Sequence, residues 1–242
     1  MKIALSLHGL FDSVQDLNSK GIDGYNHIKN NILNKGDVDV YIHSWETDKQ
    51  KEIEELYNPK KSIFEPQIDF TNIVKERKLD KLPNTPRKPE VILSHLYSVT
   101  EAMKLVYESK INYDLVIKAR FDLGRINRLT SGPHNQTNPY PVQCINLQTD
   151  IEKNKLYMAD WQYFKQGPAD MWFYGSYEIM SKFKDLYNSL HDNMYVGSKL
   201  HDFAMSMEGN PGDLANAVIF YKFWMLENGL WKNKLPLKTF WE

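Results

Sequence analysis

The residues best suited to chemistry lie along one short segment, Tyr113–Leu123. Read with the period of two that a strand imposes, its apolar residues fall on one face, while Lys118, Arg120 and Asp122 fall on the other, near the carboxyl end. In open α/β sheets, ligands bind beyond the carboxyl ends of the strands. Two cations beside a carboxylate suit a phosphate-bearing ligand. A surface ladder of cations with Asp122 is the structural alternative.

We therefore predict that Lys118 and Arg120 bind substrate and that Asp122 binds Mn²⁺ or Mg²⁺, since a carboxylate oxygen is a hard ligand suited to these ions. Such a cation offsets the charge that builds on a departing nucleoside diphosphate. A single carboxylate is a weak metal site, however, so a structural Arg120–Asp122 ion pair stays open as an alternative.

A second candidate, Asp170, precedes the aromatic segment Met171–Tyr174. We predict that Asp170 acts as a general base on an acceptor hydroxyl and that Trp172, with Tyr174 on the same strand face, stacks on a sugar. The alternative is an aspartate that caps a turn before a buried strand.

The third candidate is the turn at His8 and Gly9, which follows the first predicted strand and brings backbone N–H groups toward a nucleotide; an ordinary turn is the alternative. The chain holds no Gly-x-Gly-x-x-Gly and no P-loop sequence, so neither a dinucleotide fold nor an NTPase is indicated. Polar residues also gather late in the chain as possible ligands or bases, without the spacing of a zinc site: His201, Asp202, Glu208 and Asp213.

The elements that position these residues alternate between strands and helices. Alternating apolar residues predict strands near 2–8, 38–43 and 114–121, and an aromatic strand over 171–174. Spacings of three and four predict helices over 25–33, from Pro89 through 106, over 179–190 and from Pro211 to Gly229. A short strand is expected within 57–66, and 124–169 reads as loop. The order predicts an α/β fold with a mainly parallel central sheet flanked by helices.

Composition narrows the class of protein. The 242 residues are 42% hydrophobic and 25% charged, which is ordinary for a globular chain, and we predict a single domain over 1–242. A formal charge of −1 argues against general nucleic-acid binding. Cys144 is the single cysteine, which fits a reducing compartment. Because no stretch reaches the apolar length of a membrane span or a signal peptide, we expect a cytoplasmic protein without an integral membrane segment.

Taken together, several segments resemble the small glycosyltransferase-like proteins of the GT-A type found in bacterial surface-polysaccharide clusters and in large viruses. In chain order these segments are Lys2–Gly9, Val38–Trp45, Tyr57–Lys61, Phe64–Gln67, Leu93–Ser98, Tyr113–Leu123 and Asp170–Ser176. The resemblance implies a Rossmann-like GT-A fold, with a nucleotide-sugar-binding half over 1–123 and an acceptor-side half over 124–242.

The resemblance also implies what the site does. A nucleotide-sugar donor binds at the ends of the first strands, a metal and diphosphate bind at the strand carrying Arg120 and Asp122, and a glycan accepts the sugar in surface polysaccharide or glycoprotein glycan synthesis. The chain departs from the family at the metal motif, Asp-x-Asp, because Arg120 occupies the position of the first acid.

We thus predict a glycosyltransferase that moves a sugar from a nucleoside diphosphate to a glycan hydroxyl. The missing first acid leaves a rival open, namely a catalytically inactive nucleotide- or glycan-binding protein on the same fold. A metal-dependent phosphoesterase is a second rival, although it normally needs more clustered His and Asp ligands than this sequence offers.

Overall fold

The computed structural model describes residues 1–12, 21–81, 87–127, 140–141, 144–145, 147–148, 150–160, 165–207 and 211–238. Its centre is one seven-stranded sheet with the order β3-β2-β1-β4-β8-β7-β9. The strands are β1 (Lys2–Gly9), β2 (Asp37–Ser44), β3 (Lys61–Phe64), β4 (Leu115–Arg120), β7 (Leu156–Asp160), β8 (Trp172–Gly175) and β9 (Lys234–Lys238). A separate two-stranded ladder joins β5 (Ile126–Asn127) to β6 (Tyr140–Pro141).

The sheet is mostly but not wholly parallel. Strands β1, β2, β3 and β4 run parallel, with His8 opposite both His43 and Arg120. Strand β8 runs antiparallel to β4 and β7, and β9 pairs with β7 in parallel. The prediction of a mainly parallel α/β sheet is confirmed in this coarser form, and the three predicted strands near 2–8, 38–43 and 114–121 are present.

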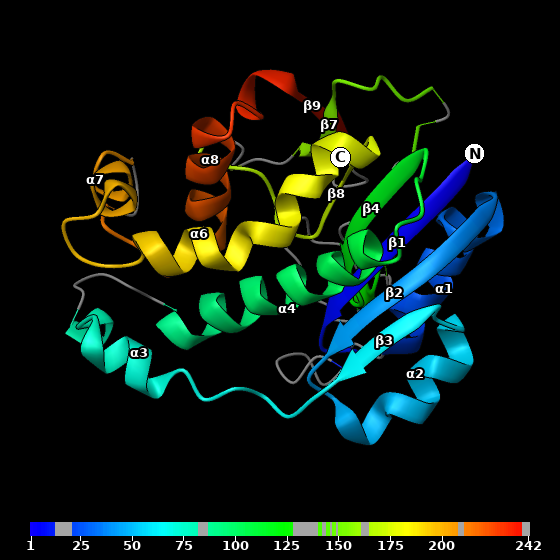
Figure 1. Cartoon of the computed structure of the whole chain (residues 1–242), viewed down its shortest axis with the longest axis horizontal. Helices are drawn as coiled ribbons and strands as arrows, with labels where there is room; N and C mark the ends of the chain where they lie inside the picture. The colour runs from blue at the N-terminus through cyan, green and yellow to red at the C-terminus, as the bar shows by residue number, and fades with distance from the viewer. Residues whose placement is uncertain are drawn as a thin grey trace.

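Helices cover both faces of the sheet (Figure 1). The α-helices are α1 (Gly21–Asn31), α2 (Gln50–Tyr57), α3 (Thr71–Glu76), α4 (Pro89–Glu108), α5 (Tyr177–Met180), α6 (Leu186–Asn193), α7 (Lys199–Met205) and α8 (Ala217–Glu227). Short 3₁₀ turns are η1 (Leu33–Lys35), η2 (Thr47–Lys49), η3 (Leu79–Lys81), η4 (Ser181–Asp185) and η5 (Trp231–Asn233). Within the described residues, no helix is both long and apolar enough to cross a membrane.

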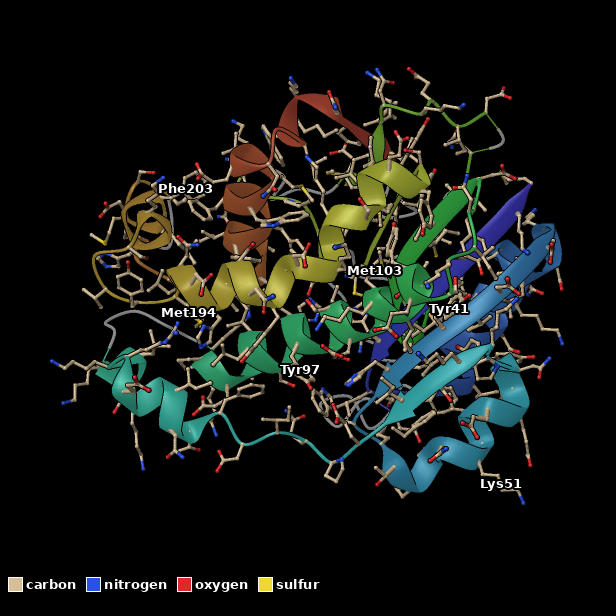
Figure 2. The ribbon with its side chains drawn as sticks, in the orientation of Figure 1. Tyr41, Lys51, Tyr97, Met103, Met194 and Phe203 are labelled. Atoms are coloured by element: carbon tan, nitrogen blue, oxygen red, sulfur yellow. The ribbon has the colours of Figure 1, made fainter. Side chains whose placement is uncertain are left out.

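Each face of the sheet packs against helices and forms its own hydrophobic core. One lies under α4, α6 and α8 and includes Tyr41 of β2 and Met103 of α4, both marked in Figure 2. The other lies against α1 and α2 and includes Ile117 of β4 and Trp172 of β8. Because successive strand residues alternate between these cores, β1, β4, β7 and β8 are buried on both sides over most of their length.

Several elements differ from the sequence predictions, among them the helix expected over 179–190, which is divided into α5, η4 and α6. The segment 156–160, expected in a loop, is β7; as a short apolar run buried on both faces, it lacks the alternation that marks a half-exposed strand. Strand β9 was not expected. The last helix begins at Ala217 rather than Pro211, because the Asn216 side chain accepts the Val218 N–H at 3.1 Å and caps the helix there.

Candidate active site

The candidate site lies where the strand order reverses. The chain leaves β1 through α1 to reach β2 on one side, and it returns through α4 to place β4 on the other side of β1. In open α/β sheets this switch point, at the carboxyl ends of the strands, is where ligands bind. The register places His8 opposite Arg120, so Gly9, Arg120 and Asp122 lie at one edge, as predicted.

On the sheet face that α4 covers, the carboxyl ends of β1 and β4 carry polar side chains in place of apolar core residues. Ser6 and His8 of β1 lie opposite Lys118 and Arg120 of β4, and His95 of α4 adds a ring whose centre is 5.3 Å from that of His8. This face is apolar farther back along the strands, where Ala4 and Val116 join the core. The change from apolar to polar residues toward the strand ends marks the site.

Arg120 holds two carboxylates. Its Nε and Nη2 donate to the two oxygens of Asp122 at 2.9 and 2.7 Å, and its Nη1 donates to Asp170 Oδ2 at 3.4 Å. The side chain of Arg120 is 34% exposed, whereas that of Asp122 is 8% exposed. Arg120 is therefore a partly exposed cation whose orientation is fixed by two hydrogen bonds to Asp122.

Asp122 is held in place by packing as well as by charge. It lies in the turn that follows β4, and helix α1 packs against that turn at Gly24. A Cβ added to Gly24 would lie 1.9 Å from the Phe121 carbonyl oxygen, so only glycine permits this approach. The close contact fixes the backbone on which Asp122 stands.

The predicted divalent cation does not fit the residues at Asp122. Both carboxylate oxygens already accept N–H groups of Arg120, and Arg125 Nη1 lies 3.7 Å from Oδ2. Across the described part of the chain, no three His, Cys, Asp or Glu side chains gather as a metal site. Because the Asp122 carboxylate already faces two guanidinium groups, the residues around it do not fit a divalent cation.

Asp170 reaches the site because β8 runs antiparallel to β4, which brings the start of β8 beside the end of β4. Lys118 Nζ donates to the Asp170 carbonyl oxygen, and His95 Nε2 lies 3.7 Å from the Asp170 carboxylate. Burial favours the protonated acid, but the surrounding charges, of which Arg120 contributes most, together outweigh it and lower the pKa of Asp170 to about 2. Asp170 is therefore ionised at neutral pH and able to accept a proton.

Lys118 is buried and His95 is largely buried, with 14% of its side chain exposed. Lys118 is fully buried over the rings of Phe173 and Tyr221, at 5.1 and 5.5 Å from their centres, and burial lowers its pKa to about 7. Burial also lowers the pKa of His95 to about 3. The imidazole of His95 is thus neutral at pH 7, and its contact with Asp170 is not an ion pair.

His8 lies deeper than predicted. It is 1% exposed, and among the described residues neither of its ring nitrogens has a hydrogen-bond partner. Burial, with the nearby charge of Lys118, holds its pKa well below the usual value, so the ring is neutral. Substrate binding by His8 stays a prediction, and in this conformation its ring is covered rather than presented to solvent.

The Gly9 backbone is also engaged. Its N–H donates to Ser98 Oγ at 3.0 Å, and its carbonyl accepts from Ser44 Oγ at 2.8 Å. In this conformation the Gly9 N–H is therefore already used, and the binding of a nucleotide by backbone N–H groups at this turn stays a prediction. Gly9 has φ +97°, which explains the glycine at this turn.

Sequence reasoning missed the chain of hydrogen bonds that continues from Gly9. Ser98 Oγ lies 2.8 Å from His43 Nδ1, and His43 Nε2 lies 2.9 Å from Glu65 Oε1. Since a carboxylate only accepts, Nε2 carries the hydrogen, and Nδ1 accepts from the Ser98 hydroxyl. One signal was available: His95 and Ser98 are polar residues three apart on an otherwise apolar helix face.

The predicted stacking role of Trp172 is wrong. Trp172 is fully buried in the core against α1 and α2, on the sheet face opposite to Lys118, and stacks on Tyr174 with 5.5 Å between ring centres. The period of two did place both rings on one face, but that face is covered. Of the late polar group, Asp213 is buried and accepts the Ala215 N–H, while Glu208 lies outside the described residues.

Comparisons with known proteins give weak structural likeness and no match in sequence. No family model matches the sequence, and no curated protein matches it. Among solved structures, the chain is similar to apo mouse xyloside xylosyltransferase 1, with 12% identity, a TM-score of 0.46, and coverage of 98% of this chain and 84% of that one. A likeness this low carries no functional argument, so the site is judged on its own geometry.

Proposed function

We propose that the protein transfers a sugar from a nucleoside diphosphate sugar to a hydroxyl of a glycan acceptor, on a GT-A-like fold. The observation that carries the proposal is the partly exposed guanidinium of Arg120 at the carboxyl end of β4, beside the switch point with β1. This is where an α/β sheet binds phosphates, and Arg is the side chain best shaped for them.

Some of these residues are proposed to bind the donor, and others to hold the binding residues in place. Arg120, with Arg125 beside it at 26% exposure, binds the diphosphate and stabilises the charge that develops as it leaves. Asp122 orients Arg120 through the bidentate contact. Lys118 holds the backbone of Asp170 from below. Because the ligand set at Asp122 does not fit Mn²⁺ or Mg²⁺, no step is assigned to a metal.

In the proposed reaction, the acceptor hydroxyl oxygen attacks the anomeric carbon as the bond from that carbon to the diphosphate oxygen breaks. The hydroxyl proton passes to the Asp170 carboxylate, and the nucleoside diphosphate leaves with the bonding electrons. This direct displacement inverts the anomeric centre. Asp170 contacts Arg120, which brings base and leaving-group site within one cluster.

The rival function is binding of a nucleotide or glycan without sugar transfer. The engagement of both Asp122 oxygens by Arg120 favours a nucleotide- or glycan-binding protein that lacks transferase activity. Thermal shift with nucleoside diphosphates, followed by a donor-turnover assay, separates the two functions. Stabilisation without turnover of any donor in a panel of UDP- and GDP-sugars supports the binding protein.

The direct test compares Arg120→Gln with Lys60→Gln, which removes a surface cation paired with Asp39 away from the site. We expect Arg120→Gln to lower donor turnover by roughly 10²–10³-fold, the usual worth of one stabilising donor, and Lys60→Gln to leave it unchanged. Equal turnover in both variants overturns the proposal. A strict requirement for added Mn²⁺ overturns the assignment of a metal-free site.

A further inference from the structure

A second candidate site lies apart from the Arg120 cluster. A surface cavity of about 690 Å³ opens between the end of α3 and the connection from α6 to α7. Figure 1 shows these elements together at the end of the molecule away from the N-terminus. The cavity is lined by Glu76, Arg77, Lys78, Lys81, Tyr195, Val196 and His201.

The two walls of the cavity are tied together. Arg77 Nη1 donates to the His191 carbonyl oxygen at the end of α6, and Nη2 lies 3.0 Å from His191 Nε2. A second, longer bond of 3.5 Å reaches the carbonyl of Met194, marked in Figure 2. These carbonyls belong to a helix end, where acceptors lack partners within the helix. The cavity is thus a built feature of the packing between α3 and α6.

The cavity wall is positively charged. Within the described residues, no carboxylate lies within ion-pair distance of Arg77, Lys78 or Lys81, which all line the cavity. His201 Nδ1 accepts the Gly197 N–H at 3.3 Å, so Nε2 carries the hydrogen of the neutral ring and is a donor. The wall therefore offers several donors against one acid, Glu76.

Apolar surface flanks these donors. Tyr195 is 46% and Val196 is 54% exposed, on the wall opposite α3. An acidic sugar combines the two needs, because its carboxylate, phosphate or sulfate seeks cations while the C–H face of its ring packs on an aromatic side chain. The volume of about 690 Å³ lies within the range of roughly 300–1,000 Å³ that small-ligand sites occupy.

We propose that this cavity binds an anionic saccharide unit of the glycan acceptor, with the acidic group among Lys78, Lys81 and His201 and the sugar ring against Tyr195. This proposal rests on the proposed function, because a bound saccharide is an acceptor only if the protein is a transferase. It assigns the substrate class that the Arg120 cluster leaves open, namely an acidic rather than a neutral glycan.

The structure supplies a matched pair of variants for the test. Lys78 and Lys110 both follow a helix end with φ of +54° and +56°, and both are exposed. Glycine adopts this backbone with less strain, so Lys78→Gly and Lys110→Gly each remove a lysine without destabilising the fold. Only Lys78 lines the cavity. A change confined to Lys78→Gly therefore reports the cavity itself.

The experiment measures binding of a sulfated dextran oligosaccharide and of its unsulfated parent by calorimetry at physiological ionic strength. We expect the sulfated form alone to bind, with affinity about two- to fivefold weaker in Lys78→Gly, the usual worth of one surface ion pair, and unchanged in Lys110→Gly. Tyr195→Ala weakens binding and Tyr195→Phe preserves it.

Three results overturn the proposal: no binding of the sulfated oligosaccharide, an equal effect of both glycine variants, or equal binding of a single-stranded oligonucleotide of the same charge. Donor turnover in the absence of acceptor is measured in parallel. If donor turnover persists while sulfated dextran fails to bind, only this inference fails. If sulfated dextran binds and no donor is turned over, the proposed transferase function fails instead.

Discussion

The guanidinium of Arg120 contacts two carboxylates, and the contact with Asp122 is stronger than the contact with Asp170. Asp122 accepts two N–H groups at hydrogen-bond distance, while Asp170 receives one at 3.4 Å. In the proposed reaction, the donor diphosphate binds the exposed side of Arg120 and competes first with the weaker contact, the one to Asp170. Because Arg120 is the main cause of the low pKa of Asp170, that competition raises the pKa and makes Asp170 a stronger base once the donor is bound.

The first prediction follows from this role. Asp170→Asn keeps the shape and the hydrogen bond to Arg120 but removes the proton acceptor. We expect kcat for transfer to fall by roughly 10²–10⁴-fold, the usual worth of a positioned base, with little change in donor KM. Steady-state kinetics at saturating donor measure the change, with Asp185→Asn, an exposed carboxylate paired with Lys184, as the control. Unchanged transfer in Asp170→Asn removes it from the mechanism.

The second prediction concerns the pH dependence of stability. Lys118 has a folded pKa of about 7, below the value near 10.4 of an unfolded lysine. The unfolded chain therefore binds more protons between these values, and the free energy of unfolding rises with pH across this window. Below pH 7 both states hold the proton, and the folded state bears the full cost of the buried charge.

The variant Lys118→Met, which keeps the chain length without the charge, isolates this contribution. From pH 7 to pH 9 we expect the wild type to gain about 2 kcal/mol of unfolding free energy relative to Lys118→Met, at about 1.4 kcal/mol per pH unit. Urea unfolding at each pH measures the difference. Parallel pH profiles for the two proteins show that Lys118 keeps an ordinary pKa.

At the scale of elements, one chain of hydrogen bonds links four of them at the edge of the site. It runs from Gly9 at the end of β1 to Ser98 on α4, to His43 on β2 and to Glu65 after β3. Burial lowers the pKa of His43, so the ring stays neutral and the direction of donation is fixed. The chain therefore sets the spacing between α4 and the strand ends.

The third prediction tests this link through Ser98→Ala, which leaves the Gly9 N–H and His43 Nδ1 without their partner. Unsatisfied buried groups cost about 1–3 kcal/mol, so the urea midpoint falls at constant slope. Ser94→Ala on the same helix is the matched control, because Ser94 accepts only an exposed bond from Gln67. An equal effect of the two variants contradicts the link.

The elements themselves were largely predictable. Alternating apolar residues located β1, β2 and β4, and spacings of three and four located α4. Strand β7 escaped because Leu156–Ala159 is an apolar run without alternation, and β9 because no sequence signal separates it from a loop. The sequence likewise placed Lys118 and Arg120 on one face of β4, as observed.

The partners of each side chain were not predictable. Period and spacing assign a face but not what covers it, so Trp172 was expected at the surface and is buried under α1 and α2. The engagement of Asp122 by Arg120, and of the Gly9 N–H by Ser98, depends on contacts between segments far apart in the chain. The predictions of a metal at Asp122 and of a nucleotide at Gly9 assumed groups without partners, whereas both groups are hydrogen-bonded within the fold.

At the scale of the whole molecule, the predicted halves 1–123 and 124–242 are parts of one sheet. Strand β4 of the first half pairs with β8 of the second, and the core under α4 includes Phe173, Phe183 and Tyr221 from the second half. The site crosses the same boundary, since Arg120 contacts Asp170. Neither half can bury its apolar surface without the other.

The fourth prediction is that the two halves do not fold separately. We expect the fragment 1–123 to show no cooperative unfolding by circular dichroism, because it exposes the unpaired edge of β4 and the apolar face of α4. The whole chain should unfold in one calorimetric transition whose van't Hoff and calorimetric enthalpies agree, the behaviour of a single cooperative unit. Two resolved transitions, or a fragment that melts sharply, contradict the single domain. A folded fragment that also bound UDP or GDP would further show that the donor site needs neither Asp170 nor the covering helices.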